Sequence, residues 1–467
     1  MDLDNNLNTN KIKKFLQEKG VDIEALPNNL MTTLIDEMLK VMDGGGTEVE
    51  GAIDITENGT YDVSTFAEAV VNVEGGSENR LKKLFDTTKS SAYMFHNRYY
   101  TGTVTSPNYS SSVNVEGVFN ENDTENVEDA SYMFSKVHMK NLTTLRFPNL
   151  KIANNMFELS YFTNTGLQQG ERLQDIVNTI DFSKITHANY MFSLCGKNKT
   201  FTLPTTNFSS LIEGKYMFGG GTSGNYPQIS NTTEFNFPVA TNLSCLFIYN
   251  DMFTQEKLII NIGTEEQTSD CNLSSMFNGV KMFNCSLKEV EINKLGSGKV
   301  NLSNFFDYGS IEKIIFTNPI VASNIAYFSR YNRVLVSIEG IIDLRHSISN
   351  SMDLGYLFDG CASLESFTFK NIGKYFVIGS GTSWGHLLTL ETLLNTIQEL
   401  VDTGSTKALV MGSANLDKLA NTYVKLTGEA EEEEGITKLP FEVCESTDEG
   451  ALHIINEYAS LKNWTIR

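Results

Sequence analysis

The residue types that could carry chemistry are scattered along this chain. The six histidines and six cysteines form neither a His-x-x-x-His nor a Cys-x-x-Cys pair, and no metal-ligand spacing joins them. No Walker motif is present, and no Gly-x-Gly-x-x-Gly stands between a predicted strand and a predicted helix. Two carboxylates could hydrolyse a glycoside, but among 57 acidic residues chance pairs at a suitable separation are expected. We therefore expect no enzyme, no cofactor and no metal site, and mainly buried, free cysteines.

Two further features could bind rather than catalyse. Trp384 stands beside Gly385 and could stack on a sugar ring, although packing in the core is the interpretation that we favour. The acidic stretch from Glu429 to Glu434 is expected to be a solvated loop.

Charge and hydropathy limit the partners. A formal charge of −21 and a pI near 4.8 repel phosphate backbones, so nucleic-acid binding is not expected. No window approaches eighteen apolar residues, so we expect no membrane insertion. The first residues are polar and acidic, which does not resemble a secretory leader.

A short signature ending in Phe organises the chain. It begins with Tyr93-Met94-Phe95 and returns in varied form nine more times, about 29 residues apart on average, which is typical of repeat proteins. The copies end at Phe95, Phe134, Phe157, Phe192, Phe218, Phe247, Phe277, Phe306, Phe328 and Phe358. We expect these rings to stack on one another as a spine, because one repeat cannot bury its apolar side alone.

Alternating segments between the signatures predict strands with one buried face. They are residues 142–147, 234–237, 258–262, 287–292, 311–316 and 364–369. After residue 387 the pattern changes. Apolar residues at helical spacing from 390 to 400 predict a helix, 408–411 a strand, 415–420 a helical turn, 451–461 a second helix, and 464–466 a final strand.

These patterns predict an α+β repeat protein with four parts. Residues 1–46 are a helical docking segment and linker, 47–79 a small β-hairpin module and linker, 80–386 the repeats, and 387–467 an α/β C-terminal cap. The apolar stripes of the first segment would dock on a partner, although packing within this chain remains open. The candidate docking stripe is Phe15, Leu16, Leu34, Ile35 and Leu39, and the aromatics of a candidate receptor loop are Tyr99, Tyr100 and Tyr109.

At Phe358-Asp359-Gly360-Cys361-Ala362-Ser363-Leu364 the chain resembles the BspA-type leucine-rich repeat, and the resemblance covers about 290 residues through the Tyr-Met-Phe copies upstream. It implies a leucine-rich-repeat solenoid with short strands. Residues 55–63 and 70–73 are similar to a module of tail and baseplate proteins of phages infecting Firmicutes. Residues 461–466 resemble the end of phage-encoded BspA-like proteins.

The resemblance implies a non-enzymatic bacteriophage virion protein of the tail, baseplate or fibre type that attaches to the host surface. Its expected partners are other virion proteins through the N-terminal segment, a host cell-surface protein or glycan, and further copies of itself. Its expected location is the virion, assembled in the host cytoplasm and extracellular after release. The alternatives are a purely structural or decoration protein of the virion, a bacterial BspA-like surface adhesin, and a wall-degrading enzyme.

Overall fold

The computed structural model covers the chain in two compact units. One comprises residues up to 211 together with 217–230, and the other comprises 212–216 together with 231–467. The structure describes residues 101–103, 106–108, 113–114, 121, 124–136, 138–140, 142, 144–163, 171–195, 200–220, 228–229, 232–250, 253–280, 286–347, 356–374, 376–378, 388–402, 404–433 and 436–467. The predicted N-terminal helices and the small β module lie outside these residues.

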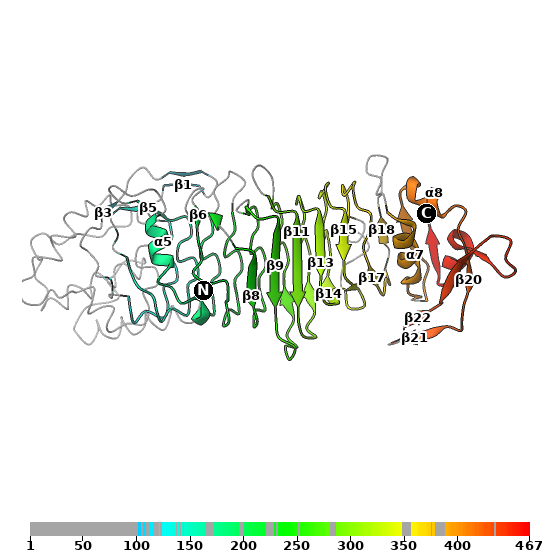
Figure 1. Cartoon of the computed structure of the whole chain (residues 1–467), viewed down its shortest axis with the longest axis horizontal. Coiled ribbons are helices and arrows are strands. Elements are labelled where there is room, and N and C mark those ends of the chain that lie inside the picture. The colour runs from blue at the N-terminus through cyan, green and yellow to red at the C-terminus, as the bar shows by residue number, and fades with distance from the viewer. Residues whose placement is uncertain are drawn as a thin grey trace, which may run out of the picture. The chain divides into compact units, whose positions relative to one another are not determined.

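The described residues of the first unit form short strands and one helix (Figure 1). Its elements are β1 (Thr101–Thr103), β2 (Ser106–Asn108), β3 (Val113–Asn114), β4 (His138–Lys140), β5 (Tyr161–Thr163), α5 (Glu171–Val177), the 3₁₀ turn η2 (Phe182–Lys184), β6 (Thr200–Phe201) and β7 (Gln228–Ile229). The β3-β4-β5 and β6-β7 pairs are parallel, and β1-β2 is antiparallel. Helix α5 was not expected from the sequence.

The second unit contains two five-stranded parallel sheets. The first has the order β15-β13-β11-β9-β8, and Figure 1 shows most of its strands side by side. Its members are β8 (Glu234–Phe237), β9 (Lys257–Ile262), β11 (Glu289–Lys294), β13 (Lys313–Phe316) and β15 (Ser337–Glu339). The second sheet consists of β10 (Cys271–Asn272), β12 (Val300–Asn301), β14 (Ile320–Asn324), β16 (Ile342–Asp343) and β17 (Phe369–Lys370), in that order.

Alternation of buried and more exposed residues explains the first sheet. Leu258, Ile260 and Ile262 of β9 are buried, whereas Lys257, Ile259 and Asn261, which alternate with them, are not. On the outer face, the Lys257 Nζ lies 2.7 Å from carboxylate oxygens of both Glu289 and Glu291 on the next strand. Opposite charges on neighbouring parallel strands favour this register over a one-residue shift.

The strand predictions for 234–237, 258–262, 287–292 and 311–316 are confirmed, with ends shifted by up to two residues. At 364–369 only Phe369 lies in a strand. The strand prediction for 142–147 is wrong, because its carbonyl groups accept hydrogen bonds from side-chain hydroxyls and not from a neighbouring strand. Thr124 Oγ1 donates to Arg146 O (2.6 Å), and Thr179 Oγ1 donates to Leu145 O (2.8 Å).

Residues 388–467, here called the cap, mix helices with short sheets. Strand β18 (Phe376–Ile378) pairs with β19 (Lys407–Met411), and β19 pairs with β25 (Trp464–Ile466), both in parallel. The other elements are α7 (Leu390–Gln398), α8 (Ser413–Leu419), β20 (Tyr423–Leu426), β21 (Glu431–Glu433), β22 (Ile436–Lys438), β23 (Phe441–Cys444), β24 (Leu452–His453), the π turn η3 (Ile454–Tyr458) and α9 (Ala459–Leu461). An antiparallel sheet has the order β23-β20-β24.

Helix α7, strands β19 and β25 and the short helix α8 confirm four of the sequence predictions for the cap. The helix predicted at 451–461 is confirmed only in part, because β24 occupies 452–453 and the π turn η3 and the short α9 follow it. Trp464 is buried, and its Nε1 donates to Val401 O at 2.9 Å. The stretch from Glu429 to Glu434 is not a loop throughout, because β21 pairs with β22 in a hairpin that places Glu431 opposite Lys438.

The described residues therefore form a mixed α/β fold with parallel and antiparallel sheets. Among them no helix combines the length and the hydropathy that crossing a membrane requires.

Candidate binding surfaces

Most described signatures form a five-residue segment, here called a signature turn, whose first and fifth residues both take a positive φ. Seven described copies share this geometry: residues 132–136, 155–159, 190–194, 245–249, 275–279, 304–308 and 327–331. Most of these residues are not glycine, and a bulky residue at positive φ costs about 1–2 kcal/mol. Neighbouring segments must therefore hold the turn.

Backbone hydrogen bonds between successive turns provide that support. Ser275 N donates to Ser303 O (2.8 Å), Phe277 N to Phe305 O (2.9 Å), and Gly279 N to Asp307 O (2.8 Å). The intervening amides close three-residue turns, such as Met276 N to Leu273 O (3.2 Å). Alternate N–H groups therefore bond across and within the turn, and the buried backbone is satisfied.

An Asn or Asp three residues before the turn prepares its entry. Asn272 Oδ1 accepts from Ser274 N at 3.1 Å, Asn301 Oδ1 accepts from Ser303 N at 3.1 Å, and Asn324 Oδ1 accepts from Ala326 N at 3.0 Å. Such side chains bond their own backbone two residues on and so favour a turn over a continued strand. This Asn-x-small pattern is visible in the sequence and was missed.

The third residue of the turn forms the expected phenylalanine stack inside each unit. In the first unit Phe134, Phe157, Phe192 and Phe218 stack with centroids 5.5–5.8 Å apart. In the second unit, Phe247, Phe277 and Phe306 follow at 5.5 and 5.0 Å. The prediction of a ring spine is confirmed within these residues.

The stack is interrupted at residues 327–331. The prediction that Phe328 takes the stacking position there is wrong by one residue. Phe306 N bonds to Phe328 O and Tyr331 has the fifth-position φ, so Phe328 takes the second position and Ser329 the third. Phe328 instead stacks on Phe305 at 5.9 Å. Next to this change, Ser329 Oγ and both amide atoms of Asn332 are buried with no hydrogen-bond partner among the described residues.

A cluster of tyrosines surrounds one arginine at the same place. The guanidinium of Arg330 lies 4.8 Å from the ring centre of Tyr327, 5.4 Å from that of Tyr308 and 5.3 Å from that of Tyr331. Tyr356 stacks on Tyr327 at 6.1 Å. Tyr308 and Tyr356 are 45 % and 41 % exposed. We call these four tyrosines with Arg330 the Tyr/Arg cluster.

Asp307 fixes the arginine beneath the rings. Arg330 Nε and Nη2 donate to its two carboxylate oxygens at 3.1 and 2.8 Å, a two-pronged geometry that only Arg provides. Burial raises the pKa of Asp307, although the hydrogen bonds from Arg330 oppose that effect. The same bonds raise the pKa of Arg330, which keeps the cation in place. The cluster is therefore a rigid aromatic surface with a positive centre.

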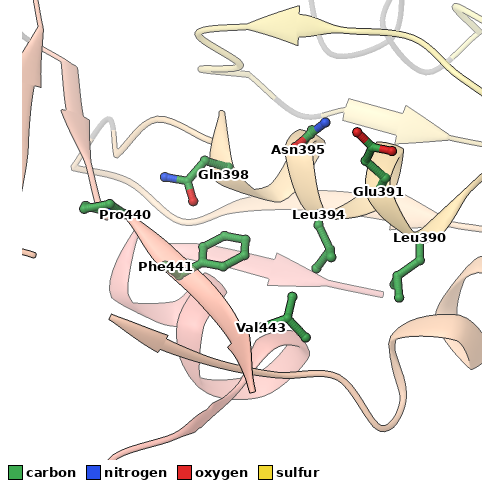
Figure 2. A pocket seen from close by; sticks show the side chains of 8 residues that line it. All are labelled: Leu390, Glu391, Leu394, Asn395, Gln398, Pro440, Phe441 and Val443. Carbon is green, nitrogen blue, oxygen red and sulfur yellow. The ribbon is translucent and has the colours of Figure 1, made fainter. Parts of the chain in front are cut away.

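A second surface lies in the cap. Helix α7 and strand β23 border a shallow apolar groove of about 550 Å³. Figure 2 shows the side chains of Leu390 and Leu394 directed from the helix toward Phe441 and Val443 of the strand. The spacing of Leu390 and Leu394 is one helical turn, so both lie on one side of α7.

The sequence-predicted site residues lie outside the described residues. They are the docking stripe Phe15, Leu16, Leu34, Ile35 and Leu39, the loop aromatics Tyr99, Tyr100 and Tyr109, and Trp384. Sequence reasoning missed the Tyr/Arg cluster. Its signal was the exchange of a signature Phe for Ser329 beside a run of aromatic residues.

The described cysteines are free thiols. Cys195, Cys271 and Cys361 are buried, and desolvation raises the pKa of each thiol to about 12. Thiols that stay protonated are poor nucleophiles and poor metal ligands. In the part of the chain that the structure describes, no three His, Cys, Asp or Glu side chains gather as a metal site.

Comparisons with protein-family models, with curated proteins and with solved structures gave no match.

Proposed function

We propose that this chain is a BspA-type leucine-rich-repeat solenoid of a bacteriophage virion protein, of the tail, baseplate or fibre type, and that it attaches to the host cell surface without catalysis. The solenoid is supported by the parallel sheets whose strands follow one another in chain order and by the hydrogen bonds between successive signature turns. The virion assignment rests on the sequence resemblance alone.

The observation that carries attachment is the Tyr/Arg cluster. Exposed tyrosine rings offer flat apolar faces with a polar edge, and a sugar ring or a partner side chain can stack on them. Tyrosine and arginine are also the residues that dominate binding energy in protein interfaces. Asp307 holds Arg330 in advance, so little side-chain entropy is lost on binding.

Weak binding at one cluster is enough for this function. A virion carries many copies of its surface proteins, and linked sites bind far more tightly than single ones. A purely structural role in the virion is the alternative. It predicts no exposed aromatic cluster on the repeats, and the exposure of Tyr308 and Tyr356 argues against it.

The test is co-sedimentation of the full-length protein with cell walls purified from a panel of Firmicutes. We expect binding to at least one wall, and a loss of about tenfold or more in the variant Tyr308→Ala/Tyr356→Ala. The matched control is Lys288→Ala, which removes an exposed side chain paired with Glu256 elsewhere on the repeats.

Wild-type protein that binds no wall above the level of a buffer control contradicts attachment to walls. Binding that survives the double tyrosine change contradicts the role of the cluster. Release of reducing ends from the wall would instead support the enzyme alternative.

A further inference from the structure

Strand β23 leaves backbone groups without partners at the edge of its sheet. It is the outer strand in the order β23-β20-β24. Thr427 N donates to Pro440 O (3.0 Å), and the register continues with Leu426 opposite Phe441 and Val424 opposite Val443. Because antiparallel pairs alternate, the N–H and C=O groups of Phe441 and Val443 point away from β20. No described residue bonds to these outward groups.

The apolar groove borders this open edge. Leu390 and Val443 are 41 % and 54 % exposed, although the buried face of α7 packs on the unit through Leu393 and Ile397. At the other end, Gln398 Nε2 donates to Leu439 O at 3.1 Å and joins the helix to the strand. Gln398 lies at one end of the lining helix, and Leu390 lies at the other (Figure 2).

We propose that this edge and groove bind an extended polypeptide segment of another protein, which adds to β23 as a further strand. The outward groups of Phe441 and Val443 supply main-chain hydrogen bonds, and an apolar side chain at every second position of the segment enters the groove against Leu390, Leu394 and Phe441. An edge strand beside a groove combines the two elements of strand addition, backbone pairing for affinity and alternate pockets for specificity.

The negative charge of the cap favours a basic peptide segment as the occupant of the groove. The cap contains 14 Asp and Glu against 6 Lys and Arg. Glu391 stands at the groove, and Glu442 and Glu445 lie on or just after β23, all three exposed. Basic residues between the apolar positions of the incoming segment would complement these carboxylates.

The pairing that uses both Phe441 and Val443 disfavours a second copy of β23 at the same edge. Antiparallel pairing of two β23 strands through Phe441 and Val443 would place Glu442 directly opposite its own copy, and like charges in that position are destabilising. The occupant is thus a different sequence. This inference is independent of the attachment proposed above, because the Tyr/Arg cluster does not contribute to the groove.

The test is selection of a yeast-displayed library of random decapeptides on the full-length protein. We expect enrichment of peptides that alternate apolar with other residues and contain Lys or Arg. Val443→Pro removes an N–H group that makes no bond within the sheet, and prolines are tolerated at such edges. We expect it, and Leu394→Glu in the groove, to weaken binding of the enriched peptides about tenfold or more.

A control variant separates binding from a general change of the surface. Leu461→Lys changes an apolar residue that is 50 % exposed and does not line the groove. It should bind as the wild type does, and thermal melting reports whether each variant is folded. The proposal is overturned if no peptide is enriched, if a folded Val443→Pro variant binds equally, or if the enriched peptides show helical rather than alternating apolar spacing.

Discussion

The repeats of the second unit and its cap satisfy backbone hydrogen bonds in different ways. In the repeats, strands β9, β11 and β13 have a parallel neighbour on each side, and signature turns bond to the next turn. In the cap, β23 has a neighbour on one side only. Neighbouring strands and turns therefore satisfy the backbone groups of this region. The cap has a free edge, which is a place to bind.

The largest effect expected in this comparison comes from the phenylalanine stack. Phe277 is fully buried and contacts Phe247, Phe305 and Phe306. We expect Phe277→Ala to lower the free energy of unfolding by about 3–5 kcal/mol. The matched change at the cap edge, Val443→Ala, should alter it by less than about 0.5 kcal/mol. Urea denaturation measures both, and a loss below that of Val443→Ala would contradict the role of the stack.

The second effect is a pH dependence of the cap. Lys462 is 1 % exposed, its Nζ donates to Gln398 O at 2.7 Å, and desolvation lowers its pKa to about 8. The unfolded chain therefore binds the Lys462 proton more tightly than the folded chain does. As pH rises from about 8 to 10.5, the folded lysine is neutral and the free energy of unfolding increases. Lys462→Met lacks this gain, so its free energy of unfolding relative to that of the wild type should fall by about 2–3 kcal/mol as pH rises across that range.

The control for this titration is Lys425→Met, which changes an exposed lysine of β20. A Lys462→Met difference that follows the Lys425→Met difference at every pH would show that the buried lysine does not titrate near pH 8.

A smaller effect, of opposite sign, is expected where the stack is interrupted. Asn332 is fully buried with both amide atoms unpartnered among the described residues, and equivalent positions of other repeats hold Val280 and Cys361. An apolar replacement removes the desolvation cost. We expect Asn332→Val to raise the free energy of unfolding by about 1 kcal/mol. A loss of stability would indicate that the amide has a bonding partner in solution.

The smallest effect is expected on the outer face of the repeats. The Lys288 Nζ lies 2.9 Å from Glu256 Oε1, and both side chains are largely exposed. Solvent and salt screen such pairs, so Lys288→Ala should change stability by less than about 0.5 kcal/mol. Denaturation at low and high salt checks this, and a change comparable to that of Phe277→Ala would contradict the ranking.

Periodicity predicted much of this fold because packing follows it directly. The Phe positions and the alternation in residues 258–262 depend on local spacing, which the sequence displays. The hydroxyls of Thr124 and Thr179 bond to carbonyl groups at and beside Arg146 in place of the hydrogen bonds of a neighbouring strand. These contacts join residues that are distant in the sequence. A sequence pattern does not contain them, which is why residues 142–147 were mispredicted.

The candidate surfaces were harder to predict than the fold. The Tyr/Arg cluster requires knowing that Ser329 takes the third position of its turn, and a search for a final Phe selected Phe328 instead. The groove joins α7 to β23, which lie more than forty residues apart in the chain. Its helix was predicted from apolar spacing, but the strand was not.

Hydrogen–deuterium exchange of the native protein tests the contrast between repeats and cap most directly. Peptides covering residues 273–279 contain the amides of Ser275, Phe277 and Gly279, which bond to the next turn. Peptides covering residues 440–444 contain the outward amides of Phe441 and Val443. We predict that the bonded amides exchange roughly a hundredfold more slowly than the outward ones, since exchange requires opening of a buried array. Equal exchange of the two sets would contradict the account.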